Sequence, residues 1–130
     1  MSNEGYIPIK IELFGVASIE GHIIRYIAPL TADPILDKMP FVLRGRWSFG
    51  SKNYWTLPGV GLRVGINPKS TKDVEKGDII FNPKTDELII IVESMEMPNK
   101  INKIGKITSS NLDSIQDARN GLNTKVFKVK

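Results

Sequence analysis

The sequence contains no cysteine among its 130 residues. This absence excludes disulfide bonds, thiol nucleophiles and metal sites with cysteine ligands, and it fits a reducing compartment such as the cytoplasm. Only one histidine is present, His22. Because metal sites normally need several clustered ligands, and no serine or cysteine partner is implied nearby, we interpret His22 as structural. We therefore expect no metal and no cofactor in a cytoplasmic protein.

Long apolar runs are also absent. No stretch approaches the roughly 20 apolar residues that a membrane-spanning helix needs. The first 15 residues begin polar and then alternate as a strand does, which is not the pattern of a signal peptide. We expect no membrane partner.

Charge of one sign is not concentrated anywhere except in one small cluster. The net charge is +4, and the lysines are scattered apart from Lys100, Lys103 and Lys106. A basic balance could favour nucleic acid, but scattered lysines are more typical of a solvated surface. A nucleic-acid partner is therefore not expected. The length and the hydrophobic fraction of 41% fit one globular domain over residues 1–130.

The clearest structural signal is a pair of apolar runs, residues 79–81 and 88–92. Both are rich in β-branched residues and are bounded by turn formers, which is typical of paired strands. Asn82-Pro83 ends the first run, because proline cannot continue a hydrogen-bonded ladder. The second run is apolar on both faces, so we expect a central strand covered on each side.

Shorter patterns predict the remaining elements. We expect further strands at 6–14, 22–27, 41–49, 53–57, 62–64, 104–108 and 124–130. Short helices are expected from Thr31 to the stop at Pro40 and over 111–120. We expect an exposed loop over 67–76 and irregular structure over 93–102. About eight short strands with regular turn signals indicate a mostly β fold, either a closed barrel or a sandwich.

Several segments in succession carry a resemblance. They are Arg46-Trp47, Tyr54-Trp55, the stretch 74–79, Asn82-Pro83, Met97-Pro98 and the stretch 104–107. In this order and spacing, from about Ile9 to Val129, the chain resembles the small prokaryotic cyclophilin-like family of uncharacterised proteins. The resemblance implies a closed, mostly antiparallel eight-stranded barrel with a helix at one or both ends. It does not fix an activity, because a shared fold does not determine function.

The chain lacks the strings that accompany prolyl isomerisation in true cyclophilins. Neither the Phe-His-Arg strand nor the glutamine-glycine motif occurs, and Phe41-Val42-Leu43-Arg44 is only a faint echo. We therefore assign no catalytic residue. Lys52-Asn53 stands where the family pattern often has an acidic residue before the Tyr54 position.

Arginines and aromatics gather on two strands that we expect to pair. Such residues offer stacking area and bidentate hydrogen bonds. The candidate ligand-binding residues are Arg44, Arg46, Trp47, Tyr54, Trp55 and Met97, with Phe49 nearby. The competing interpretation places Trp47 and one of Tyr54 or Trp55 in the core, because adjacent strand residues point to opposite faces.

Other residue groups are better explained by structure than by chemistry. Asp33 and Asp37, and the group Asp73, Glu75 and Asp78, fit capping and turns. The glycines over 59–65 lack the Lys-Ser/Thr of a phosphate loop.

The main hypothesis is a barrel without a recognisable catalytic set that binds a small molecule or an extended peptide. A prolyl isomerase-like enzyme and a basic barrel that binds nucleic acid are the alternatives.

Overall fold

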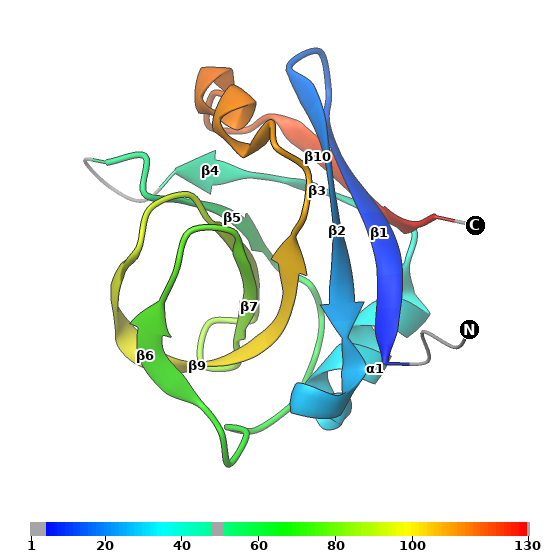
Figure 1. The fold of residues 1–130 in the computed structure, drawn as a ribbon, viewed down its shortest axis with the longest axis vertical. Helices are drawn as coiled ribbons and strands as arrows, with labels where there is room; N and C mark the ends of the chain where they lie inside the picture. Colours follow the sequence, from blue (N-terminus) through cyan, green and yellow to red (C-terminus); the bar gives the residue numbers. More distant parts are fainter. Residues whose placement is uncertain (1–4, 48–50, 130) are drawn as a thin grey trace.

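The computed structural model describes residues 5–47 and 51–129 and is built mainly from antiparallel strands. Its elements are β1 (Tyr6–Leu13), β2 (Ala17–Ile24), the 3₁₀ helix η1 (Arg25–Ile27), α1 (Pro29–Lys38), β3 (Phe41–Arg44), β4 (Arg46–Trp47), β5 (Tyr54–Pro58), β6 (Thr71–Val74), β7 (Asp78–Asn82), β8 (Glu87–Ile91), β9 (Met95–Ile107), the 3₁₀ helix η2 (Leu112–Asp117) and β10 (Asn123–Lys128). The strands wrap around a central core, with α1 at one end and η2 at the opposite end (Figure 1). The prediction of a mostly β, antiparallel fold with short helices is confirmed.

One continuous sheet connects nearly all strands. Its order is β3-β10-β1-β2-β9-β7-β8-β5-β4, and β6 pairs with β9 outside this path. The predicted closed barrel of about eight strands is wrong, because the sheet has ten strands and its two end strands, β3 and β4, do not pair with each other.

The two end strands of the sheet meet at Gly45, where the chain changes its pairing partner. A Cβ atom on Gly45 would lie 2.1 Å from Cε2 of Trp55, so only glycine fits against this ring. On one side of Gly45, β3 pairs with β10, whereas on the other side β4 pairs with β5. The predicted strand 41–49 is therefore two short strands, and its last two residues lie outside the described part.

Two apolar clusters fill the fold. The larger one contains Trp55 and Ile90 and lies inside the curved sheet, whereas the smaller one contains Ile89 and Met97. Strand β8 lies between β7 and β5 and gives alternate residues to the two clusters. The prediction of a central strand with protein on each side is confirmed.

Several local predictions are wrong, and two of them share a reason. Residues 25–27 of the predicted strand 22–27 form the 3₁₀ helix η1. Residues 62–64 form no strand, β6 lies in the predicted loop 67–76, and residues 95–102 belong to the long strand β9. Strand β9 contains Pro98, which lies where the pairing with β6 shifts register between Thr71 and Asp73. Proline is tolerated at such a bulge, because its missing N–H is not needed there. Pairing with distant strands therefore overrides the local pattern.

Within the described residues, no helix is both long and apolar enough to cross a membrane.

Candidate functional site

Both predicted binding tryptophans lie in the core. Trp55 is 0% exposed and Trp47 is 8% exposed, and their ring centroids are 5.0 Å apart in an edge-to-face arrangement. The indole N–H of Trp47 donates to the carbonyl oxygen of Ala118 at 2.7 Å, and that of Trp55 donates to Oγ1 of Thr124 at 3.1 Å. Their area and polar atoms are thus used within the fold, as the competing interpretation expected for Trp47 and one neighbour.

The other predicted site residues do not gather around one cavity. Arg44 is exposed on β3, and Arg46 donates from Nη2 to Oε2 of Glu87 at 2.7 Å. Met97 is buried, and Tyr54 packs half-buried against the same small cluster. Phe49 lies outside the described residues. Ligand binding at these positions stays a prediction, but the structure does not join them into an aromatic surface.

A different concavity lies between α1 and the end of β10. It consists of two adjoining cavities, of about 460 Å³ and 320 Å³, which share Ile7 and Lys128. We call it the α1–β10 groove. The larger cavity is lined by Ile7, Met39, Pro40, Lys125, Phe127, Lys128 and Val129. The smaller one is lined by Ile7, Arg25, Asp33, Leu36, Asp37 and Lys128.

Three distant parts of the chain build the groove. The start of β1 supplies Ile7, the segment after α1 supplies Met39 and Pro40, and β10 supplies Phe127. Strand β10 lies between β1 and β3, which places these parts next to one another. Phe41 pairs with Val126, so β3 begins one residue short of Phe127 and leaves that position of β10 without a β3 partner. The groove therefore opens where a short edge strand begins.

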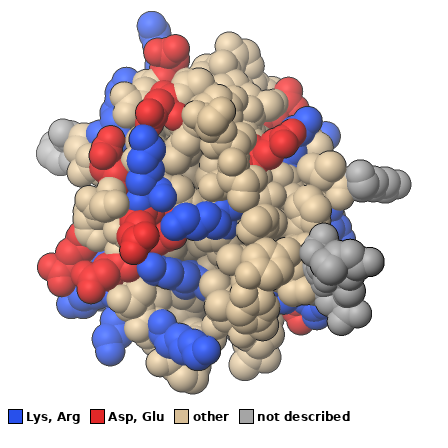
Figure 2. Space-filling view, in the orientation of Figure 1, with Lys and Arg blue, Asp and Glu red and all other residues tan. Residues whose placement is uncertain are grey.

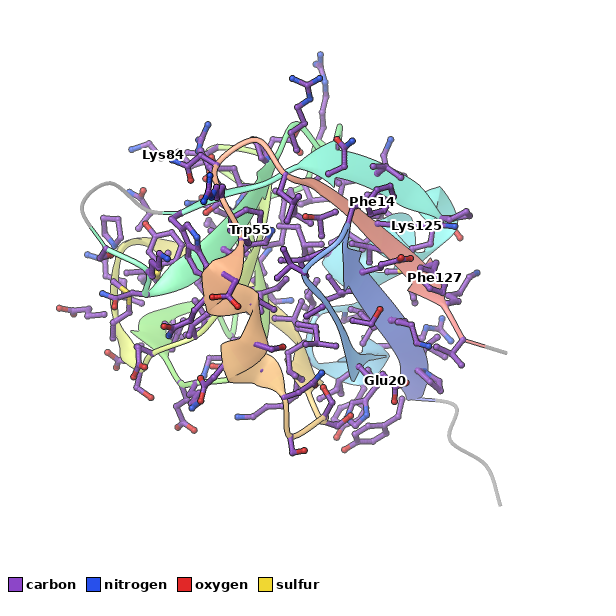
Figure 3. All side chains as sticks on the ribbon, turned by 90° about the horizontal axis from the view of Figure 1, so that it is seen from above. Phe14, Glu20, Trp55, Lys84, Lys125 and Phe127 are labelled. Atoms are coloured by element: carbon purple, nitrogen blue, oxygen red, sulfur yellow. The ribbon has the colours of Figure 1, made fainter. Side chains whose placement is uncertain are left out.

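Cationic groups lie at the edge of the apolar cavity. The ammonium nitrogen of Lys125 lies 5.0 Å from the ring centroid of Phe127, a cation–π distance. Figure 3 shows both residues along β10. Within residues 5–47 and 51–129, neither Lys125 nor Lys128 forms a salt bridge. These two charges are thus free to meet an anion.

The smaller cavity contains a paired arginine and aspartate. Arg25 donates to Asp33 in a bidentate way, from Nε to Oδ1 at 2.7 Å and from Nη2 to Oδ2 at 3.2 Å. These hydrogen bonds lower the pKa of the Asp33 carboxyl below its ordinary value. The pair therefore fixes one wall of the groove by closing η1 against α1.

Replacing Asp33 with asparagine tests this pair. The lowered pKa means that Asp33 adds stability above its unfolded-state pKa and loses that contribution as the pH falls through its folded-state pKa. Both side chains are over 40% exposed, so Asp33→Asn should cost less than about 1 kcal/mol at neutral pH and nothing in acid. Urea unfolding of both proteins at the two pH values measures this. Asp37 forms no ion pair within residues 5–47 and 51–129, so Asp37→Asn should not lower stability. An Asp33→Asn effect that persists in acid would contradict the ionic origin.

The sequence assigns no residue of the groove to a binding site. Its pattern predicts Lys125 and Phe127 only as part of an alternating last strand, and Met39 and Pro40 only as the end of a helix. The signal that could have pointed to β10 is its tail, where Phe127 and Val129 stand between lysines. Among the described residues, no three His, Asp or Glu side chains gather in a way that could hold a metal.

Charge on the surface is mixed. On the face shown in Figure 2, lysines and arginines lie among aspartates and glutamates. Lys103 and Lys106, two members of the predicted basic cluster, both contact the carboxylate of Asp78 at 3.2 Å.

Comparison with known proteins identifies the fold and no family. No protein-family model and no curated protein sequence matches this chain. The hypothetical protein AF2241 from Archaeoglobus fulgidus has a similar structure, with a TM-score of 0.75, 17% identity, and coverage of 99% of this chain and 100% of that one. McbB, solved in complex with tryptophan, has a TM-score of 0.73 and 11% identity, with coverage of 92% of this chain and 44% of McbB. The chain thus spans less than half the length of McbB, and at these identities the likeness shows the fold alone.

Proposed function

We propose that this chain binds a small molecule with an apolar body and a carboxylate in the α1–β10 groove. The observation that carries the proposal is the combination of an apolar cavity of about 460 Å³ with two lysines in its lining that form no salt bridge within the described residues. Cavities of about 300–1,000 Å³ with apolar walls and a few convergent polar groups are typical of small-molecule sites. Phe127 offers a ring for stacking, and Lys125 and Lys128 offer charge for the carboxylate.

The neighbour McbB suggests the first probe. Its structure contains tryptophan, a molecule with an aromatic body and a carboxylate. An extended peptide that ends in an apolar residue has the same chemistry at its C-terminus. The prediction from the sequence that the chain binds an extended peptide is therefore retained. Its proposed site is the α1–β10 groove and not the buried tryptophans.

A titration followed by backbone amide shifts tests this function. L-tryptophan and indole-3-acetate should give saturable shifts at Ile7, Met39 and Phe127, whereas indole, which has no carboxylate, should bind more weakly. Lys128→Gln should weaken binding of the two carboxylates about two- to fivefold, as expected for one exposed ion pair, and leave indole unchanged. Lys72→Gln, an exposed lysine on β6 outside the groove, is the control.

Two results would overturn the proposal. One is the absence of any saturable shift with all three probes. The other is a set of shifts centred on Arg44 and Arg46, which would return the site to the predicted arginine strands.

The cyclophilin-like resemblance is retained as a proposal about the fold. It is supported by an antiparallel sheet that curves around one main core with helical segments at opposite ends (Figure 1). Prolyl isomerase activity stays a prediction, and neither Arg44 nor Arg46 lines the α1–β10 groove. A protease-coupled isomerase assay tests it separately from the ligand titration.

A further inference from the structure

A separate cavity lies at the turn between β7 and β8, with no residue in common with the α1–β10 groove. Its volume is about 380 Å³, and its lining residues are Val64, Gly65, Ile66, Pro83, Lys84, Asn99 and Lys100. Three chain segments meet here: the irregular stretch 59–70, the β7–β8 turn and the first half of β9. Figure 3 shows Lys84 on the opposite side of the molecule from Lys125 and Phe127.

Two lysines face this cavity without a compensating carboxylate. Within residues 5–47 and 51–129, neither Lys84 nor Lys100 forms a salt bridge. This contrasts with Lys103 and Lys106, further along β9, which both pair with Asp78. The register of β7 with β9 pairs Phe81 with Asn102, and beyond that pair Pro83 and Lys100 line the same cavity. The two ammonium groups thus come from neighbouring backbone segments and line one cavity.

The carboxylate of the β7–β8 turn accepts hydrogen bonds from the backbone. Asp86 accepts hydrogen bonds from the amide of Gly61 at 2.7 Å and from that of Leu62 at 2.9 Å. It therefore holds the start of the stretch 59–70, and among the described residues it forms no salt bridge with Lys84. The charged residues that line the cavity are Lys84 and Lys100.

The walls are held in place before any ligand arrives. Asn102 is fully buried; its Nδ2 donates to the carbonyl oxygen of Gly65 and to Oγ1 of Thr31, both at 3.0 Å, and its Oδ1 accepts from the amide of Asn67 at 2.8 Å. The turn is fixed likewise, because the amide of Lys84 donates to Oδ1 of the buried Asn82 at 3.0 Å. A ligand here would not have to order a loop, which lowers the entropic cost of binding.

The cavity also offers an apolar wall beside its charges. Ile66 is 52% exposed, although it is a large aliphatic side chain, and Val64 and Pro83 lie next to it around the cavity. Asn99 adds an amide that can donate hydrogen bonds. Two ammonium groups, one amide and an apolar wall match a ligand that joins a doubly charged anion to an apolar body.

We propose that this cavity binds an organic phosphate, with the phosphate group between Lys84 and Lys100 and the apolar part against Ile66. A phosphate monoester carries close to two negative charges at neutral pH, so it can engage both lysines at once. A carboxylate carries a single charge and would engage them less well. This site goes beyond the proposed function and does not depend on it.

Titration with phenyl phosphate, inorganic phosphate and benzoate, followed by amide shifts, tests the site. Phenyl phosphate should give saturable shifts at Ile66, Lys84 and Lys100 and bind tighter than either other probe. Lys84→Gln and Lys100→Gln should each weaken it about two- to fivefold. Lys72→Gln and Lys128→Gln remove the same charge elsewhere and should have no effect.

The variant Ile66→Ala separates an organic phosphate site from a general anion site. Because Ile66 is exposed, its loss should not unfold the protein. It should weaken phenyl phosphate and leave inorganic phosphate unchanged. Equal binding of both phosphates, an equal effect of Lys72→Gln, or no saturable shift up to roughly 10 mM phenyl phosphate would overturn the proposal.

Discussion

Replacing Trp55 with alanine is expected to lower the free energy of unfolding by about 3–5 kcal/mol. The indole is fully buried, packs edge-to-face on Trp47, fills the space above Gly45 and donates to Thr124. Its removal leaves a cavity among β-strands that cannot collapse without moving the sheet. Since single domains are commonly stable by 5–15 kcal/mol, this is a large share of the total. Urea unfolding followed by far-ultraviolet circular dichroism measures the loss.

Two further variants show whether Trp55 acts through packing. Trp55→Phe keeps an aromatic ring but loses the hydrogen bond to Thr124, and it should cost about 1–3 kcal/mol. Arg44→Ala changes an exposed residue next to Gly45 and should stay within about 0.5 kcal/mol. A loss below about 1 kcal/mol for Trp55→Ala would mean that the indole is not part of the core. That result would favour the predicted ligand-binding surface of arginines and aromatics around Arg44, Arg46 and Trp55.

Replacing Gly105 with alanine should destabilise the protein by about 2 kcal/mol or more, because it forces apart two paired backbones. Strands β2 and β9 approach closely at two glycines in alternate register positions, with Gly105 opposite Ile23 and Gly21 opposite Ile107. A Cβ on Gly105 would lie 2.4 Å from the carbonyl oxygen of His22. The atom in conflict belongs to the backbone, so no side-chain rotation relieves it.

A matched glycine elsewhere provides the control for Gly105→Ala. Gly65 has no atom within 4 Å of its would-be Cβ, and its φ lies outside the positive region. Gly65→Ala should therefore be neutral or slightly stabilising. Urea unfolding compares the two variants, and amide hydrogen exchange should show faster opening of β2 and β9 in Gly105→Ala. Equal stability of the two variants would contradict a close approach between β2 and β9.

The local sequence pattern was sufficient where a residue's position depends only on the residues beside it in the same strand. The alternation of Ile7, Ile9 and Ile11 predicted the first strand, and the runs around Ile80 and Ile90 predicted the central pair. In each case the apolar residues recur at the period of the strand itself. Side chains along a strand alternate between its two faces, so the sequence shows which residues share a face. The face that carries the apolar residues is the one that is buried.

Local pattern was insufficient for the candidate site. Adjacent residues Tyr54 and Trp55 point to opposite faces of β5, so the strand pattern predicts that one of them lies near the surface. In the fold both faces of β5 are covered, by the larger cluster on the side of Trp55 and by the smaller cluster on the side of Tyr54. Strand β9 supplies that second cover with Met97 and Ile101, from a stretch whose pattern indicated irregular structure.

The sequence by itself determined a mostly β fold without cysteine, with its central hairpin and the apolar face of its first strand. Only the tertiary structure decided that the chain changes its pairing partner at Gly45, that Trp47 and Trp55 lie inside, and that the α1–β10 groove and the cavity at the β7–β8 turn open where distant segments meet. The physical reason is that periodicity along a strand specifies the strand's own faces, whereas strand neighbours are chosen by packing and hydrogen bonds between residues far apart in the chain. Ile7 and Phe127 line one groove because β1 and β10 pair, and no local pattern contains that pairing.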